Sequence, residues 1–256
     1  MFMHLTRRAL TTAGIASLLL LAAGTGLARA GRKHGDMPPA SSSRNASIWR
    51  VSTAAPDVAI TFDDGPDPMF TPRMLAVLNR FGAVGTFFVL GMQVARYPGV
   101  IRQEATQGSE VCNHGYSHRI LRGRADAFVS GDVRHTQIML DGLGVPRCRL
   151  FRFPYLASDA ASRSVVTHLG YRIIAANVDT QDWRQPNPEK MAAHVLGRLR
   201  AGDIILLHDG GGVRSRTVQA LGLILRGMAQ RGLHAVTVSQ LLATVPHGRP
   251  PAAGEE

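Results

Sequence analysis

The chain of 256 residues predicts an α/β fold built on a parallel sheet, and three observations support this prediction. Apolar residues make up 45% and charged residues 18% of the chain, a composition typical of a globular domain with a full hydrophobic core. Short β-branched runs alternate with stretches of helical period. Glycine stands at each expected return from helix to strand: Gly82, Gly108, Gly144, Gly170, Gly202 and Gly232. Right-handed crossovers would close such a sheet into a barrel or wind it doubly.

The expected strands are short apolar runs, and each is followed by a stretch with apolar residues at helical spacing. The runs predict strands over residues 58–62, 86–90, 110–113, 150–153, 172–178, 203–207 and 235–238. The helical stretches predict helices over residues 72–81, 100–107, 125–143, 159–169, 188–200, 217–230 and 239–243.

The N-terminus has the pattern of an export signal. Arg7 and Arg8 precede an apolar run, and Ala28-Arg29-Ala30 forms a small-residue cleavage site. The adjacent arginines predict a twin-arginine signal peptide over residues 1–30. The alternative is an uncleaved membrane anchor over residues 9–27, although its Thr and Gly residues dilute its hydropathy. We therefore expect an exported, periplasmic or secreted protein with no stable membrane insertion after cleavage.

The remaining chain divides into a linker, one domain and a tail. Residues 31–50 are rich in Gly, Pro and Ser and predict a linker. Residues 51–246 contain the strand and helix alternation and predict a single domain. Residues 247–256 have a composition similar to the linker and predict a flexible tail.

Charge and cysteine content limit the classes of partner. The formal net charge is +11, which suits an anionic envelope surface or an acidic polymer. No basic run alternates with aromatic residues, so we expect no nucleic-acid partner. Cys112 and Cys148 are the only cysteines and form no CxxC pair, which favours two buried free thiols. A single structural disulfide stays open for an exported protein. The sequence does not indicate whether the protein is a monomer or an oligomer.

Unusual polar residues follow the ends of the expected strands. They are Asp63, Asp64, His114, His118, Arg152, Tyr155, Asp179, Asp182, Trp183 and His208. Active sites of barrel and doubly wound folds lie beyond the carboxyl ends of their strands. We therefore expect these side chains to converge on one site.

The residue types in this set indicate metal-assisted hydrolysis. His114 and His118 are four residues apart, and two imidazoles with one carboxylate can hold a divalent ion with positions open to water and substrate. The adjacent Asp63 and Asp64 could then divide the work between a metal ligand and a base that acts on the water at the metal. His208 would be the general acid.

Two further residues would support the base and the acid. Arg152 could pair with the free aspartate and keep it ionised. Asp182 would raise the pKa of His208 and fix its tautomer. The segment from Asp209 to Val213, "DGGGV", lacks the Lys and Ser/Thr of a phosphate-binding loop, and we interpret it as a flexible connector.

Five motifs occur in an order that resembles the polysaccharide deacetylases, the NodB-homology carbohydrate esterases of family 4. They are "TFDDG", "HGYSH", "RFPY", "DTQDW" and "ILLHD", within about residues 56–245. The resemblance implies an irregular (β/α) barrel of about seven parallel strands, one divalent metal ion and removal of N- or O-acetyl groups from a sugar polymer. Zinc is the expected ion, with cobalt and nickel as alternatives. Gly115 departs from the family pattern, which usually has Ser or Thr there, so the rigidity of this loop is in question.

The resemblance also assigns roles by motif position. It implies Asp63 as the base, with Arg152 as the arginine that positions it, and Asp64, His114 and His118 as the three metal ligands. It implies His208 as the acid, with Asp182 as its partner. Tyr155 would supply an oxyanion-stabilising backbone N–H, and Trp183 and Leu206 would form two walls of an acetyl pocket.

The sequence therefore predicts a metal-dependent hydrolase that removes acetyl groups, N-acetyl groups above all, from a polysaccharide or oligosaccharide. Two alternatives stay open. An inactive polysaccharide-binding module would not need both a base and an acid. A non-heme iron redox enzyme would share the two histidines and one carboxylate. Peptidoglycan, chitin-like oligosaccharides, xylan and an exopolysaccharide all fit as substrates.

Overall fold

The computed structural model describes residues 45–245. The expected signal peptide, residues 31–44 of the expected linker and the expected tail lie outside the described residues. Among residues 45–245, no helix is long and apolar enough to cross a membrane.

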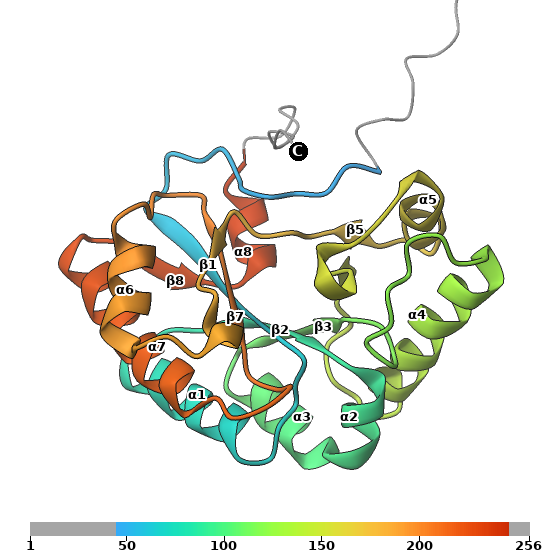
Figure 1. The fold of residues 1–256 in the computed structure, drawn as a ribbon, viewed down its shortest axis with the longest axis horizontal. Coiled ribbons are helices and arrows are strands. Elements are labelled where there is room, and N and C mark those ends of the chain that lie inside the picture. The colour runs from blue at the N-terminus through green and yellow to red at the C-terminus, as the bar shows by residue number, and fades with distance from the viewer. Residues whose placement is uncertain (1–44, 246–256) are drawn as a thin grey trace, which may run out of the picture. The chain divides into compact units, whose positions relative to one another are not determined.

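Within this range, one parallel sheet contains eight strands. Their bounds are β1 Asp57–Asp63, β2 Thr86–Val89, β3 Glu110–Asn113, β4 Leu150–Phe151, β5 Arg172–Ile173, β6 Val178–Asp179, β7 Ile204–His208 and β8 His234–Val236. The strand order is β5-β4-β3-β2-β1-β7-β6, and β8 pairs with the first residues of β1. Helices surround this curled sheet (Figure 1). The expected α/β barrel of parallel strands is confirmed.

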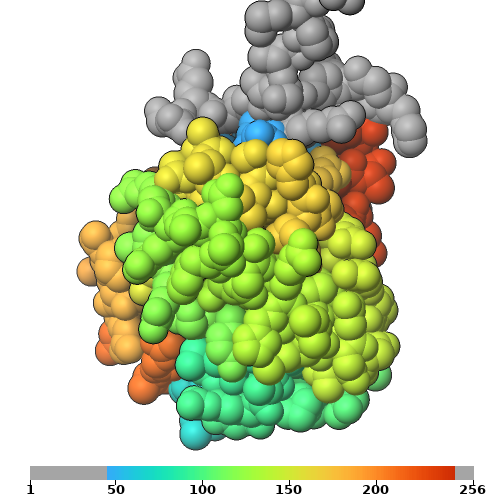
Figure 2. Space-filling view, turned by 90° about the vertical axis from the view of Figure 1, so that its right-hand side faces the viewer, coloured from blue at the N-terminus to red at the C-terminus, as the bar shows by residue number. Residues whose placement is uncertain are grey.

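The helices follow the strands as expected, with one addition. The α-helices are α1 Phe70–Arg80, α2 Gly91–Arg96, α3 Pro98–Thr106, α4 Asp126–Asp141, α5 Ala160–His168, α6 Pro188–Leu196, α7 Ser215–Gln230 and α8 Val238–Ala243. Two short 3₁₀ turns, η2 at Pro154–Leu156 and η3 at Asp182–Arg184, carry polar residues that follow strands. The short helix α2 was not expected from the sequence. Figure 2 shows the side of the molecule covered by the segments that contain α4 and α5.

The expected single strand over residues 172–178 is wrong. The chain forms β5, which pairs with β4 at one end of the strand order, and then β6, which pairs with β7 at the other end. The residues between β5 and β6 therefore cross the seam of the barrel. The run is mainly apolar and contains no glycine or proline, so its sequence pattern does not show the break.

Residues 45–50, assigned above to the linker, contribute to this seam. Ile48 forms a parallel bridge with Ile174, and Arg50 forms an antiparallel bridge with Asp203. Ile48 is buried in the same apolar cluster as Ile174. The folded domain therefore begins several residues before the expected boundary.

The two cysteines form a disulfide, so the expectation of free thiols is wrong and the alternative is confirmed. Cys112 on β3 is bonded to Cys148, which lies just before β4. The bond therefore ties together the strands that lead to His114 and Arg152.

Alternation along β1 directs its side chains to two environments. Val58, Ile60 and Phe62 belong to the large apolar cluster that includes residues of α1 and α7. Thr61 and Asp63 have the opposite direction and point into the barrel, where both contact Arg152. The interior of the barrel is therefore polar at the end where β1 stops.

Candidate active site

The two adjacent aspartates reach the same mouth of the barrel because the backbone turns between them. Asp63 is the last residue of β1, and Asp64 has a left-handed backbone with φ of 74°. A left-handed conformation is uncommon for a residue other than glycine, although Asp tolerates it better than most. The turn lets both carboxylates face the site instead of opposite faces of the strand.

Three side chains lie where they could hold a metal ion. The Oδ1 of Asp64 is 3.0 Å from the Nε2 of His118 and 3.5 Å from the Nε2 of His114. The three ligand atoms lie within 4.8 Å of one another. The Nδ1–H of His114 donates to the carbonyl of Arg152 over 2.8 Å, which leaves Nε2 as the free ligand atom. The Oδ1 of Asp64 is buried without a hydrogen-bond partner, so the donor set fits a divalent cation.

The charge state of Asp64 suits this role. Burial alone would raise the pKa of its carboxyl, but the neighbouring imidazoles of His114 and His118 outweigh burial and hold the pKa well below its ordinary value. Asp64 is therefore ionised at neutral pH.

Asp63 is held by a buried arginine. Arg152 donates from Nη1 to the Oδ1 of Asp63 over 2.7 Å and to the hydroxyl of Thr61 over 2.7 Å. Its other donors reach the carbonyls of Ile174 and Ala175, and Arg152 is fully buried. The second oxygen of Asp63 stays on the side of the metal ligands, 3.7 Å from the Nε2 of His114. The pair therefore fixes one oxygen of the carboxylate and leaves the other free for proton transfer.

His208 and Asp182 form a second charged pair. The Nδ1 of His208 lies 2.7 Å from the Oδ1 of Asp182, whose Oδ2 accepts from the backbone N–H of His208 and from the hydroxyl of Thr217. Burial lowers the pKa of His208, but the hydrogen bond and charge of Asp182, with the charges of Asp63 and Asp64, raise it to about 9. His208 is thus an imidazolium at neutral pH, and its Nε2–H is free to donate.

The remaining predicted residues lie around this mouth. Tyr155, on η2, has a left-handed backbone and a ring 4.4 Å from that of His118, and 65% of it is exposed. Leu206 is buried on β7, on the same face as His208. Trp183 is 51% exposed and stacks with the guanidinium of Arg184, 4.5 Å from its ring centroid. The structure thus places Trp183 on the rim rather than within a closed pocket.

Sequence reasoning missed two buried carboxyls beside the site. Asp209 is fully buried, accepts a hydrogen bond from Thr71 and has an Oδ1 without a partner. Burial, with the charges of Asp64 and Asp63, raises its pKa to about 7, against the opposing hydrogen bond from Thr71. Glu104 on α3 is also fully buried, and neither of its oxygens has a partner. The position of Asp209 after His208 was the one available signal. The segment from Asp209 to Val213 does connect β7 to α7, but Asp209 and Gly210 are buried, which the interpretation as a flexible connector did not predict.

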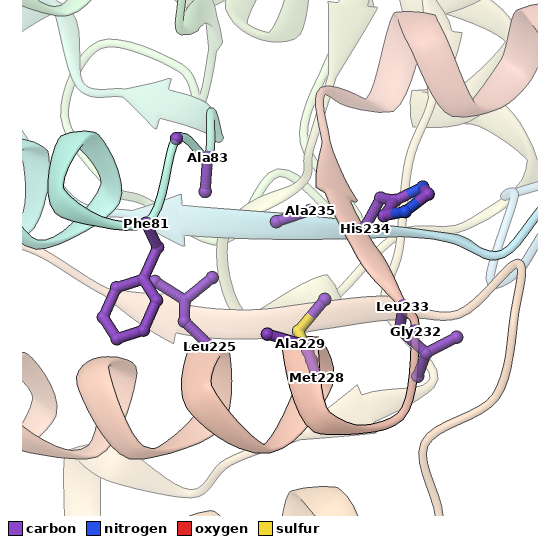
Figure 3. A pocket seen from close by; sticks show the side chains of 10 residues that line it. Phe81, Ala83, Leu225, Met228, Ala229, Gly232, Leu233, His234 and Ala235 are labelled. Atoms are coloured by element: carbon purple, nitrogen blue, oxygen red, sulfur yellow. The ribbon is translucent and has the colours of Figure 1, made fainter.

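A separate cavity lies away from the residues of the candidate active site. A cavity of about 380 Å³ lies between the end of α1, α7 and the start of β8 (Figure 3). Its walls are mainly apolar, with side chains such as Phe81, Leu225 and Met228. It opens at the amino ends of the strands, so it is not part of the candidate active site.

Comparison with known proteins identifies the family. Residues 50–174 match the family model described as polysaccharide deacetylase. A peptidoglycan-N-acetylglucosamine deacetylase of Bacillus cereus is 36% identical over 76% of this chain and 92% of its own length. The chain belongs to the polysaccharide deacetylase family. It is therefore an enzyme, a polysaccharide deacetylase, as the sequence motifs predicted.

Other relatives agree in sequence and in structure. A chitooligosaccharide deacetylase of Azorhizobium caulinodans is 33% identical over 72% of this chain and 93% of its own length. A crystal structure of a peptidoglycan N-acetylglucosamine deacetylase in complex with 4-naphthalen-1-yl-N-oxidanyl-benzamide has a TM-score of 0.73 at 30% identity, and the match covers 77% of this chain and 92% of that chain. A family 4 carbohydrate esterase from Streptomyces lividans in complex with acetate has a TM-score of 0.66 at 31% identity, covering 72% of this chain and 93% of that one.

Proposed function

We propose that this deacetylase is a metal-dependent hydrolase that removes N-acetyl groups from a glycan, with Asp63 as base and His208 as acid. The observation that carries the proposal is the convergence of a metal-type donor set with a separate carboxylate and a separate imidazolium. Asp64, His114 and His118 supply the donor set. The base and the acid each have their own buried partner, Arg152 and Asp182.

In this proposal, Asp63 and His208 carry out the proton transfers of the reaction. A divalent cation held by Asp64, His114 and His118 would supply Lewis acidity, which lowers the pKa of a coordinated water and polarises the acetyl carbonyl. Asp63 accepts a proton from the attacking water through the oxygen that Arg152 leaves free. His208 donates its Nε2 proton to the leaving nitrogen, so that acetate and a free amine are formed. Tyr155 would present its backbone N–H to the oxygen of the carbonyl.

The donor set supports the choice of metal ion, and the names of the relatives support the choice of substrate. Imidazole and carboxylate ligands in a partly filled shell suit zinc, with cobalt and nickel as further candidates. The relatives are named for peptidoglycan N-acetylglucosamine and for chitooligosaccharides. We therefore propose a substrate with N-acetylglucosamine units.

The geometry disfavours the two alternative functions. An inactive binding module would not need a buried arginine to hold the carboxylate of Asp63 in place or a buried aspartate to keep His208 charged. A redox enzyme would need no paired acid and base. Export is supported by the twin-arginine pattern of residues 1–30 and by the disulfide between Cys112 and Cys148, since disulfides persist in oxidising compartments.

Acetate release tests the proposal. The purified protein should be treated with a chelator, reloaded with zinc, cobalt or nickel, and assayed on peptidoglycan, chitooligosaccharides, acetylated xylan and acetylated chromogenic esters. We expect acetate release from the N-acetylglucosamine substrates, loss of that activity after chelation and recovery with added metal. Full activity in the chelated protein, after metal analysis has verified removal of the ion, would contradict the proposal.

A further inference from the structure

The segment that follows His208 is built against the two aspartates of the site. The backbone N–H groups of Asp209 and Gly210 both donate to the carbonyl of Asp63, over 3.1 and 3.4 Å. A Cβ on Gly210 would overlap the carbonyl oxygen of Asp64, so no larger residue fits there without a shift. A Cβ on Gly211 would lie 2.9 Å from the Oδ2 of Asp64. The two glycines therefore let this segment approach Asp64 closely.

A buried arginine fixes the two glycines in place. Arg214 donates from Nε to the carbonyl of Gly210 over 2.7 Å and from Nη2 to that of Gly211 over 3.2 Å. Only 5% of Arg214 is exposed. The segment is thus an ordered part of the site that one charged side chain holds in position.

The side chain of Asp209 contacts the other side of the same turn. Its Oδ2 occupies the space that a Cβ on Gly65 would need. The same oxygen accepts a hydrogen bond from the hydroxyl of Thr71, which in turn accepts from the backbone N–H of Asp67 over 2.8 Å. Asp209 therefore links β7 to the loop that begins directly after Asp64.

Asp64 needs such support because its backbone is left-handed. A left-handed backbone is strained for a residue other than glycine, and it persists where the surroundings fix it. We propose that Asp209 is a positioning residue that holds Asp64 in this conformation, aimed at His114 and His118. Asp209 acts through its shape against Gly65 and its hydrogen bond from Thr71, and its charge is not required. The inference rests on the proposed metal centre.

Zinc affinity tests this role without any assay of activity. The zinc dissociation constant of each folded variant should be measured by competition with a chromophoric chelator. Asp209→Ala should raise it about 10- to 100-fold, the range found when a residue that supports a metal ligand is removed. Asp209→Asn keeps the shape and an oxygen acceptor for Thr71, so its dissociation constant should stay close to that of the unchanged protein. Thr71→Val removes the hydrogen bond and should weaken zinc binding even if Asp209→Ala fails to fold.

Asp203→Ala is the matched control. Asp203 is a buried aspartate just before β7, at the opposite end of the same strand, and it accepts from the backbone N–H of Arg200 and from Asn177. Its removal should lower the stability of the fold without changing zinc affinity. A zinc dissociation constant of Asp209→Ala or Thr71→Val equal to that of the unchanged protein would overturn the positioning role. A loss in Asp209→Asn as large as in Asp209→Ala would overturn the claim that charge is not required. Absence of zinc binding by the unchanged protein would instead refute the metal centre itself, and the role of Asp209 with it.

Discussion

Replacement of Asp182 by Asn should lower the pKa of His208 and shift the alkaline limit of activity. His208 must be protonated to act as an acid, and its pKa of about 9 lies well above the ordinary value of 6.5. This rise corresponds to roughly 3 kcal/mol in favour of the imidazolium. Asp182 is the partner in direct contact, whereas the contributions of Asp63 and Asp64 would be offset by a bound cation.

The hydrogen bonds around Asp182 predict which way the introduced amide would turn. Two donors, the backbone N–H of His208 and the hydroxyl of Thr217, converge on Oδ2, so the amide oxygen in Asp182→Asn should occupy that position. The amide nitrogen would then face the Nδ1 of His208 and donate to it, which requires an unprotonated Nδ1. Loss of the charge and this reversed hydrogen bond both disfavour the imidazolium. We expect the pKa of His208 to fall by about one to two pH units.

The assay is the pH dependence of kcat from about pH 5 to 10 on one chitooligosaccharide substrate, with the imidazole titration followed by NMR. Asp179→Asn is the matched control, because Asp179 lies three residues earlier and accepts from the backbone N–H of Gln181 instead of contacting His208. The alkaline limb should move to lower pH in Asp182→Asn and stay in place in Asp179→Asn. An alkaline limb unchanged in Asp182→Asn would refute the pairing as the source of the raised pKa.

Three further predictions concern stability. Replacing both Cys112 and Cys148 by Ala should lower the free energy of unfolding by about 4 kcal/mol, the chain-entropy value for a separation of 36 residues, and equal urea midpoints with and without the disulfide would contradict this. Arg152→Met should destabilise the fold by about 3–5 kcal/mol, because it leaves the buried carboxylate of Asp63 without its partner, and a loss below about 1 kcal/mol would argue against that pair. Burial, followed by the charge of Asp209, raises the pKa of Glu104 well above 4.5, so the wild-type fold should lose up to about 1.4 kcal/mol per pH unit as pH rises from 4.5 toward the folded pKa. Glu104→Gln should remove this loss, so the free energy of unfolding of the variant, relative to that of the wild type, should be higher at pH 7 than at pH 5. If the free energies of unfolding of the two proteins change with pH in parallel, the raised pKa of Glu104 is excluded as the cause.

The alternation of strands and helices, and the polar residues at the strand ends, could be predicted from the sequence because each depends on local pattern. Strand β3 has the bounds that its apolar run predicted, and Asp64, His114 and His118 meet because parallel strands end at one edge. The pairing of Cys112 with Cys148 depends on the adjacency of β3 and β4, which the pattern of residues does not contain.

Other features depend on contacts distant in sequence. The break between β5 and β6 arises because the chain crosses from one edge of the curled sheet to the other, and only the strand order of the whole sheet imposes that crossing. The burial of Asp209 depends on Thr71 and Gly65, which are far from it along the chain. A run of Asp and Gly has the composition of a loop whether or not it packs against a site, so its order was not predictable from composition.

The division of labour between Asp63 and Asp64 is the central claim, and one paired measurement tests it most directly. Zinc content and the rate of acetate release should be measured on the same preparations of Asp63→Asn and Asp64→Ala. The account predicts that Asp63→Asn keeps its zinc and loses about 10²- to 10⁴-fold in rate, since it removes general base catalysis, whereas Asp64→Ala loses zinc and rate together. Loss of zinc from Asp63→Asn as complete as from Asp64→Ala, or full zinc retention by Asp64→Ala, would contradict it.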